Sequence, residues 1–278
     1  MGKTTLALAQ AAYLSSQGKR VLLVEIADRS SVSTLLGIPP LAYEITSLES
    51  SLSAIKITGH EALKEYLMRQ VRIEKIYRLF FENRPMRYFF DAAPAIRDLM
   101  ILGKIVHELE HPKSGKLFDH IVVDTPATGH GLFLFKTPGI VEKITRFGPI
   151  FQRAFHIQSI LESPDITSIH VVTLPRPIVI TETLELSLSL KKLKLPLLNL
   201  FVNRLIFSQK KFSAHEIAAF SQKTQDPTLQ LLSGRFLNEL RELKRLEKLS
   251  KLPLHIFSEI VETPTLNQLA DWFGKAFS

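Results

Sequence analysis

Five short apolar runs, separated from one another by helical stretches, constrain the fold of this chain more than any other feature. They are Val21–Ile26, His120–Asp124, Ile169–Leu174, Leu197–Asn203 and Leu254–Phe257. None keeps the strict apolar–polar alternation of a half-exposed strand, so each predicts a strand that is buried on both faces. Strands of this kind between helices predict an α/β fold, a doubly wound parallel sheet with helices on both sides.

Length and composition set the broad class of the protein. The chain has 278 residues, 45% of them hydrophobic, which is enough for one domain over 1–278 with a sizeable core. It has no Cys, so disulfides and cysteine-ligated zinc are excluded. The net charge of +8 is spread over helices, and we expect no specific nucleic-acid partner. No signal peptide and no uncharged apolar run of about 18 residues is found, which predicts a cytoplasmic protein without a transmembrane segment.

The residues Gly2-Lys3-Thr4-Thr5 match the second half of the phosphate-binding loop G-x-x-x-x-G-K-[ST]. In such a loop, backbone N–H groups surround the phosphates of a nucleotide, while Lys3 would reach its terminal phosphates and Thr4 would bind Mg²⁺. The residues that follow predict a helix and then the strand Val21–Ile26. A helix that leaves this loop and returns to a strand is half of a nucleotide-binding βαβ unit.

Two later strands end in side chains that suit the same site. Asp124 ends an apolar strand, as a Walker-B carboxylate does, so it is predicted to hold Mg²⁺ or to orient the attacking water. Residues 125–132 contain a Pro and two Gly and predict a stiff loop that orders when ATP binds. Asn203 ends another strand, and its amide suits an adenine edge. An Asp or Asn that merely caps a turn would give the same pattern.

A helical insertion is predicted between strands of the sheet, at about 59–116 and 134–165. Leu63, Leu67 and Val71 recur there at helical spacing, and prolines separate further helices. The insertion also carries many apolar residues between Leu79 and Leu102. These residues either pack the insertion against the sheet or form a groove for an apolar helix or peptide client.

Together these residues resemble the ArsA-type ATPases, the arsenite-pump and tail-anchored-protein-targeting group with the deviant Walker A loop K-G-G-x-G-K-[ST]-T. More closely, the chain is similar to a bacterial branch of anion-transporting ATPase-like proteins. The most specific match is D-T-P-A-T-G-H-G-L, residues 124–132, and further similarity lies at 92–105, 172–175 and 202–204. The resemblance spans essentially the whole chain.

The resemblance implies a P-loop NTPase-like fold and Mg²⁺-dependent ATP hydrolysis coupled to the opening and closing of a homodimer. ATP and Mg²⁺ would be the cofactors. Residue by residue, it places Gly2, Lys3, Thr4 and Thr5 in the phosphate loop, Asp124 at the Walker-B aspartate and Asn203 at the adenine contact.

The sequence departs from the family pattern in three places. Met1 stands where the family often has Val, so we expect a misassigned gene start, with the first strand and half of the loop missing and with poor folding and weak ATP binding as the result. The switch-I Asp of the family aligns with Ala27, and Asp28 follows one residue later, which predicts slow hydrolysis unless Asp28 swings in. The missing cysteines argue against the tail-anchored-targeting role and against arsenite binding.

Three other functions remain open from the sequence. The first is an inactive ATPase-fold protein that acts through interactions, which the truncated loop and Ala27 favour. The second is a ParA- or MinD-type ATPase, which the long insertion disfavours. The third is a zinc hydrolase built on the H-E-x-x-H match at His107 and His111, for which no clear third ligand is found.

Overall fold

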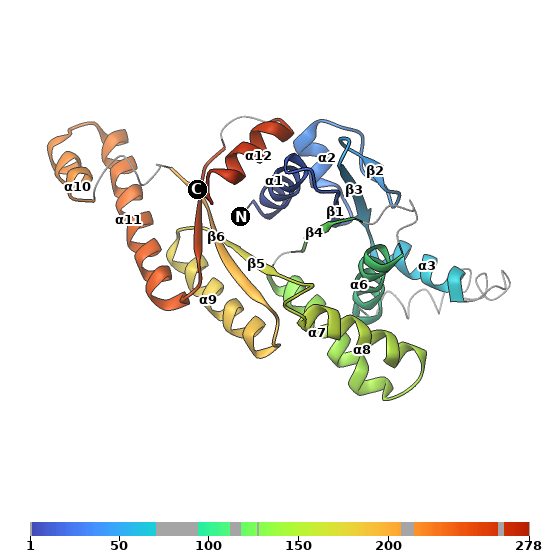
Figure 1. Ribbon diagram of the computed structural model, residues 1–278. Coiled ribbons are helices and arrows are strands. Elements are labelled where there is room, and N and C mark those ends of the chain that lie inside the picture. The colour runs from blue at the N-terminus through green and yellow to red at the C-terminus, as the bar shows by residue number, and fades with distance from the viewer. Residues whose placement is uncertain are drawn as a thin grey trace.

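The computed structural model describes residues 2–70, 94–111, 118–126, 128–206, 214–260 and 264–277. Within these ranges helices alternate with mostly parallel strands, so the predicted α/β class is confirmed (Figure 1). The strands are β1 (Val21–Ile26), β2 (Thr46–Ser47), β3 (Leu52–Ile57), β4 (His120–Asp124), β5 (Ile169–Thr173), β6 (Leu197–Leu205) and β7 (Leu254–Ser258).

The described strands form two sheets. The first has the order β2-β3-β1-β4, in which only the short β2 is antiparallel to its neighbour. The second has the order β5-β6-β7 and is parallel throughout. The carboxyl ends of β1 and β4 lie side by side, because Glu25 in β1 is in register with Asp124 in β4.

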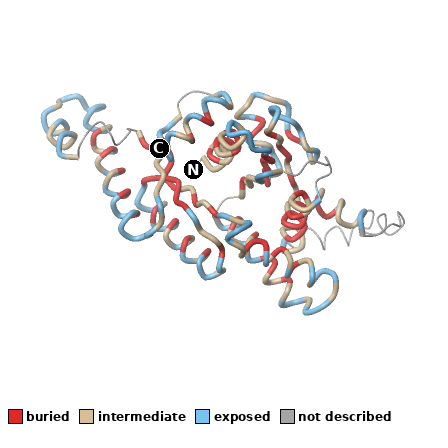
Figure 2. Tube along the Cα trace, viewed as in Figure 1, coloured by how far each residue is buried: buried red, intermediate tan, exposed pale blue. Residues whose placement is uncertain are grey.

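Helices cover both faces of the two sheets. Side chains of β1 alternate between two apolar clusters, with Leu22 and Val24 in one and Val21 and Leu23 in the other. The helices that contribute to the second cluster are α1 (Lys3–Ser16), α2 (Ser31–Leu36) and α12 (Leu266–Gly274). Those that contribute to the first are α3 (Gly59–Gln70), α6 (Pro94–Glu110), α7 (Thr128–Thr145), α8 (Pro149–Glu162), α9 (Pro177–Lys192) and α11 (Pro227–Ser250). The buried residues accordingly line the strands and the inner sides of these helices (Figure 2).

A cleft of about 390 Å³ separates the two sheets and runs between β4 and β5. Consecutive residues of each strand line it, residues 120–124 on one side and 169–172 on the other. Successive side chains of a strand point to opposite faces, so a cavity lined by consecutive residues faces the edge of the strand. The parallel strands predicted from the sequence are therefore divided between two sheets, and the cleft exposes two strand edges with the backbone groups that a further parallel strand would use.

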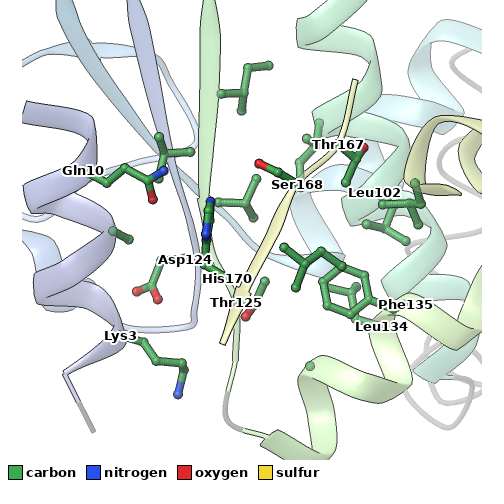
Figure 3. A pocket seen from close by; sticks show the side chains of 18 of the residues that line it. Lys3, Gln10, Leu102, Asp124, Thr125, Leu134, Phe135, Thr167, Ser168 and His170 are labelled. Carbon is green, nitrogen blue, oxygen red and sulfur yellow. The ribbon is translucent and has the colours of Figure 1, made fainter. Parts of the chain in front are cut away.

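Helix α1 covers one side of this cleft through Leu6, Ala7 and Gln10. The opposite side is formed by apolar residues of several helices, among them Leu102, Leu134 and Phe135, which Figure 3 shows facing the cleft from the right. Both walls between the strand edges are therefore largely apolar.

The helical insertion predicted at about 59–116 and 134–165 coincides with α3, α6, α7 and α8, and its status as a separate subdomain stays a proposal. Residues 71–93 and 112–117, with most of the apolar residues noted in the insertion, lie outside the described residues. The expected loop at 125–132 is wrong in part, because α7 begins at Thr128. A Cβ on Gly131 would lie 3.1 Å from the Pro126 carbonyl oxygen, so a glycine lets the first turn of this helix pack closely on the preceding segment.

Helix α10 (Ala214–Lys223) packs beside α11. The side chain of Asp226 accepts hydrogen bonds from the backbone N–H groups of Thr228 and Leu229, and Pro227 occupies the first turn, so a new helix starts here. In the part of the chain that the structure describes, no helix is both long and apolar enough to cross a bilayer.

Candidate functional site

The site forms where the amino end of α1 meets the carboxyl end of β4. Thr4 lies in the first turn of α1, and its Oγ1 donates a hydrogen bond of 2.6 Å to Oδ2 of Asp124. In Figure 3 the Asp124 carboxylate points toward α1, and Lys3 extends from the first turn of the same helix nearby. Lys3 and Asp124 both line the mouth of the cleft between β4 and β5. The structure thus brings together two of the predicted segments that are far apart in the sequence.

Asp124 is a buried carboxyl group in an unusual electrostatic environment. Asp124 is only 8% exposed. The loss of hydrating water raises the pKa of its carboxyl group above the ordinary value, and the negative charge of Glu25 adds a smaller increase. The hydrogen bond from Thr4 and the positive charge of Lys3 act in the opposite direction without cancelling the rise. Ionised Asp124 is therefore short of compensating charge, and a cation bound beside it would supply that charge.

Gly2 packs directly against Asn203 at the start of α1. Its φ of 81° is left-handed, and a Cβ at this position would lie 2.4 Å from Nδ2 of Asn203. The Asn203 side chain is buried at the end region of β6, where its Oδ1 accepts a hydrogen bond of 2.9 Å from the backbone N–H of Arg204. Only glycine meets both conditions at position 2 without strain. The predicted adenine contact Asn203 therefore lies beside the predicted phosphate loop.

The first turn of α1 has the features of an anion-binding helix terminus. The turn contains no acidic residue, and Gly2 offers no side chain to cap its N–H groups. Backbone N–H groups and the helix dipole make such a terminus favourable for phosphate. The Thr4 hydroxyl and the Asp124 carboxylate are hard oxygen donors of the kind that Mg²⁺ prefers. Gly2, Lys3, Thr4 and Thr5 on one side and Asp124 on the other thus fit a magnesium-bound phosphate.

Asp28, the candidate for polarising water, lies in the loop between β1 and α2. Its residue is exposed, and its backbone carbonyl oxygen accepts a hydrogen bond of 3.3 Å from Nζ of Lys56. Ala27 precedes it and offers no polar side chain. The side chain of Asp28 therefore faces solvent and forms no hydrogen bond with Thr4 or Asp124.

Glu25, to which no sequence pattern assigned a role, lies beside Asp124 in the sheet. Glu25 is only 1% exposed, and its carboxylate accepts hydrogen bonds from Oγ of Ser30 and from the backbone N–H groups of Ser31 and Val32. An acidic residue inside the apolar run V-L-L-V-E-I was the available signal, because a buried carboxylate needs dedicated partners.

The H-E-x-x-H residues do not form a site of the predicted kind. Glu108, which would have to act as general base, is fully buried and forms an ion pair of 2.6 Å with Lys104. The rings of His107 and His111 lie 5.5 Å apart at the end of α6. Among the described residues no group of three potential metal ligands is found near them or elsewhere. The buried Lys104–Glu108 pair accounts for the Glu without invoking zinc.

Comparison with known proteins identifies relatives along most of the chain. A family profile described as anion-transporting ATPase matches residues 1–152 and 145–273. The ATPase BagA of Mycobacterium tuberculosis is 32% identical over 216 residues, which cover 73% of this chain and 62% of that protein. The arsenical pump-driving ATPase of Acidiphilium multivorum is 31% identical over 142 residues, covering 50% of this chain and 24% of that protein.

A third relative matches along nearly the full chain. The ATPase GET3C of Arabidopsis thaliana is 24% identical over 326 aligned positions, covering 99% of this chain and 80% of the plant protein. The chain spans 62% of the length of the mycobacterial relative named above. The family profile accounts for far more than half of the residues, in agreement with the P-loop NTPase-like arrangement of strands and helices. The chain therefore belongs to the anion-transporting ATPase family, the ArsA-type ATPases.

Proposed function

We propose that this protein binds and hydrolyses ATP in a Mg²⁺-dependent reaction at the junction of α1 and β4. The observation that carries the proposal is the hydrogen bond from Thr4 to Asp124, with Lys3 on the same helix turn. This arrangement unites the three groups that a magnesium-bound triphosphate requires, a cationic side chain, a hydroxyl and a carboxylate. Membership in a family of ATPases supports the same reaction class.

Each residue has a separate role in the proposed reaction. The N–H groups of the first turn of α1 bind phosphate oxygens, and the ammonium group of Lys3 neutralises negative charge on the terminal phosphates. Thr4 and Asp124 hold Mg²⁺, which supplies electrostatic stabilisation of the phosphates when it is bound. Gly2 has no Cβ, so the backbone of the loop can lie directly against the side-chain amide of Asn203. This amide is oriented by the hydrogen bond that its Oδ1 accepts from the N–H of Arg204. Asp28 would orient water once its exposed side chain turns toward the bound phosphates.

We further propose that nucleotide binding is coupled to a homodimer and to an apolar client helix or peptide. The support for a client surface comes from α7, α8 and the turn between them, where Ile144, Phe147, Ile150 and Phe155 are exposed at 74%, 83%, 47% and 57%. Large apolar side chains clustered on neighbouring helices are typical of interaction surfaces. Light scattering of the purified protein with and without Mg²⁺·ATP, and with Phe147→Ser, tests the dimer and this surface.

One observation favours a second candidate, an ATPase-fold protein that binds nucleotide without turning it over. Ala27 provides no carboxylate at the position where the family has its switch-I Asp, and the Asp28 side chain is exposed to solvent. Without a group that orients water, hydrolysis would be slow even with bound Mg²⁺·ATP. In this case the protein would act through nucleotide-dependent interactions.

Steady-state hydrolysis and equilibrium binding of Mg²⁺·ATP separate these candidates. For the ATPase we expect turnover that falls by roughly 100-fold or more in Lys3→Ala and Asp124→Asn, since each removes a charge next to the transferred phosphate. Lys19→Ala and Asp165→Asn are matched controls, because both side chains are exposed and lie beyond the ends of α1 and α8, outside the first turn of α1 and the carboxyl end of β4. Binding without turnover selects the second candidate, and absence of nucleotide binding contradicts both.

An N-terminally extended version of the protein provides a further arm of this experiment. The extension consists of an apolar strand of six residues followed by Lys-Gly-Gly directly before Met1. An extended segment of this length is ~20 Å long, similar to strands such as β4 and β5. It could form hydrogen bonds with the edge of β4 and the edge of β5 that face the cleft. We expect the extension to tighten ATP binding, because it adds N–H donors to the loop. An extension with alternating Lys residues in the strand, which cannot enter an apolar cleft, is the control.

A further inference from the structure

The loop between β1 and α2 is attached to the sheet through one buried carboxylate. Oε2 of Glu25 accepts a hydrogen bond of 2.6 Å from Oγ of Ser30, and Oε1 accepts bonds of 2.5 and 3.2 Å from the N–H groups of Ser31 and Val32. Glu25 is 1% exposed, so these bonds replace the water that an ionised carboxylate would otherwise bind. Both oxygens are thus committed to the start of α2.

A connected set of hydrogen bonds extends from this carboxylate through α2. Ser30 Oγ accepts bonds from the N–H of Ser33 (3.1 Å) and from its hydroxyl (2.8 Å), and the Ser33 hydroxyl in turn accepts a bond of 2.8 Å from the N–H of Leu41. Ser30 is therefore both the N-cap of α2 and the residue that joins the cap to Glu25. Loss of one member leaves buried partners without a bond, which is the costly way to break such a network.

The position of Glu25 relates this network to the candidate site. Glu25 and Asp124 are paired in register on neighbouring parallel strands, so their side chains leave the sheet on the same face. Glu25 is also near enough to raise the pKa of Asp124 through its negative charge. Residues 27–29 connect β1, which contains Glu25, to Ser30, the N-cap residue of α2. Within this segment the carbonyl oxygen of Asp28 accepts a hydrogen bond from Nζ of Lys56 in β3.

We propose that Glu25 is the positioning residue that holds the 27–30 loop beside Asp124, so that the turnover of Mg²⁺·ATP depends on it more than nucleotide affinity does. Glu25 itself does not act as the base, because three donors already occupy its carboxylate. The inference rests on the proposed function for its kinetic part, whereas the attachment of the loop is independent of any activity. A loop fixed at this edge keeps its residues at a constant distance from the magnesium ligand, which matters for the reaction and little for initial binding.

Glu25→Gln and Ser30→Ala test the proposal, with Ser30→Thr and Thr265→Ala as matched controls. Ser30 and Ser31 donate to different oxygens of Glu25, and glutamine replaces one of these oxygens with an NH2 group that cannot accept. Alanine at position 30 removes the hydroxyl altogether. Threonine keeps both the cap and the bond to Glu25. Thr265 caps α12 through the same kind of bond, so its loss costs a comparable helix cap away from the 27–30 loop.

Hydrogen exchange in the absence of nucleotide reads the loop directly. We expect the amides of Ser31 and Val32 to exchange roughly tenfold faster or more in Glu25→Gln and Ser30→Ala, and to remain unchanged in Ser30→Thr and Thr265→Ala. Unchanged exchange at these two amides in Glu25→Gln overturns the attachment of the loop.

Steady-state kinetics then read the consequence for the reaction. We expect kcat to fall roughly tenfold or more in Glu25→Gln and in Ser30→Ala, with KM for ATP within about twofold, and to stay near the wild-type value in Ser30→Thr. An equal loss of kcat in Thr265→Ala, or a loss confined to KM, overturns the positioning role. A wild-type protein that does not hydrolyse ATP overturns the proposed function and this kinetic part together, while the exchange result still decides whether Glu25 holds the loop.

Discussion

Thr4 and Asp124 are separated by 120 residues, yet the Thr4 hydroxyl donates a 2.6 Å hydrogen bond to the Asp124 carboxylate. The bond joins the first turn of a helix to the carboxyl end of a neighbouring parallel strand. Polar groups gather at this edge because every parallel strand ends there and the following segments leave the sheet from it. The central proposal is that this pair holds Mg²⁺ on a nucleotide whose phosphates lie at the start of α1.

Replacing Thr4 tests the contribution of its hydroxyl group. In Thr4→Ala, Asp124 loses its hydrogen bond and the proposed magnesium site loses one oxygen, so we expect roughly 10- to 100-fold weaker binding of Mg²⁺·ATP. Thr4→Ser keeps the hydroxyl and is expected to bind within a few-fold of wild type. Isothermal titration measures both affinities. Equal binding by Thr4→Ala and wild type would rule out this hydroxyl as a ligand.

Asp124 is predicted to reduce the stability of the nucleotide-free protein at neutral pH. The pKa of its carboxyl group is raised in the folded state, so ionisation opposes folding at pH values above the raised pKa and has no effect below the unfolded value of about 4. Asp124→Asn should therefore be more stable than the wild type at pH 7, as expected where a functional residue costs stability. The gain should shrink as the pH falls. Urea unfolding at several pH values measures it, and a gain independent of pH would contradict the assignment.

Two glycines with the same backbone conformation form a matched pair. Gly2 and Gly18 have φ values of 81° and 78°, but a Cβ on Gly2 would lie 2.4 Å from Asn203 Nδ2, whereas a Cβ on Gly18 would meet nothing within 4 Å. Gly18→Ala should cost about 1 kcal/mol for its left-handed backbone alone. Gly2→Ala should cost more and should weaken ATP binding, because the loop or Asn203 must move. The double variant Gly2→Ala with Asn203→Ala should recover part of that difference in thermal unfolding, and no recovery would show that the clash is unimportant.

His170 is predicted to make the protein less stable in mild acid. Burial, together with the charge of His255, lowers the pKa of His170 to about 4, so the folded state resists its protonation. The unfolded chain takes up this proton near pH 6.5, so stability should fall between about pH 6.5 and pH 4, by at most roughly 3 kcal/mol. His170→Phe keeps a ring next to Phe201, 4.8 Å away in the native pair, and should lose this pH dependence. The exposed His120, replaced by Gln, is the control, and an unchanged profile in His170→Phe would exclude His170 as the cause.

Much of the fold follows from the sequence because buried parallel strands are distinctive. The runs Val21–Ile26 and His120–Asp124 coincide with β1 and β4, and the other three predicted strands agree to within two residues. Strand β3 was missed because Ser53 and Lys56 interrupt its apolar residues, and only pairing with β1 shows that Leu52, Ala54 and Ile55 are buried. The start of α7 was missed because glycines usually indicate loops, while here they allow close packing of its first turn.

The candidate site was predictable only where a motif named its residues. Lys3 and Asp124 were expected to converge from the phosphate-loop and strand-end patterns, and the structure places them at one edge of the sheet. Their roles stay predictions. The contact of Gly2 with Asn203 depends on how the second sheet is placed against α1, which no local pattern encodes. No role was predicted for Glu25, because the role of a single acidic residue in a strand depends on its hydrogen-bond partners, which only the folded structure shows.

Electron paramagnetic resonance of Mn²⁺, as a substitute for Mg²⁺, with ATP tests the central claim most directly. Mn²⁺ takes the same oxygen ligands, and its spectrum distinguishes free from bound ion. We predict one ATP-dependent Mn²⁺ site per wild-type chain, lost or weakened at least about tenfold in Thr4→Ala and in Asp124→Asn, and retained in Asp165→Asn. Equal occupancy by Mn²⁺·ATP in wild type, Thr4→Ala and Asp124→Asn would show that Thr4 and Asp124 do not hold the metal of a bound nucleotide.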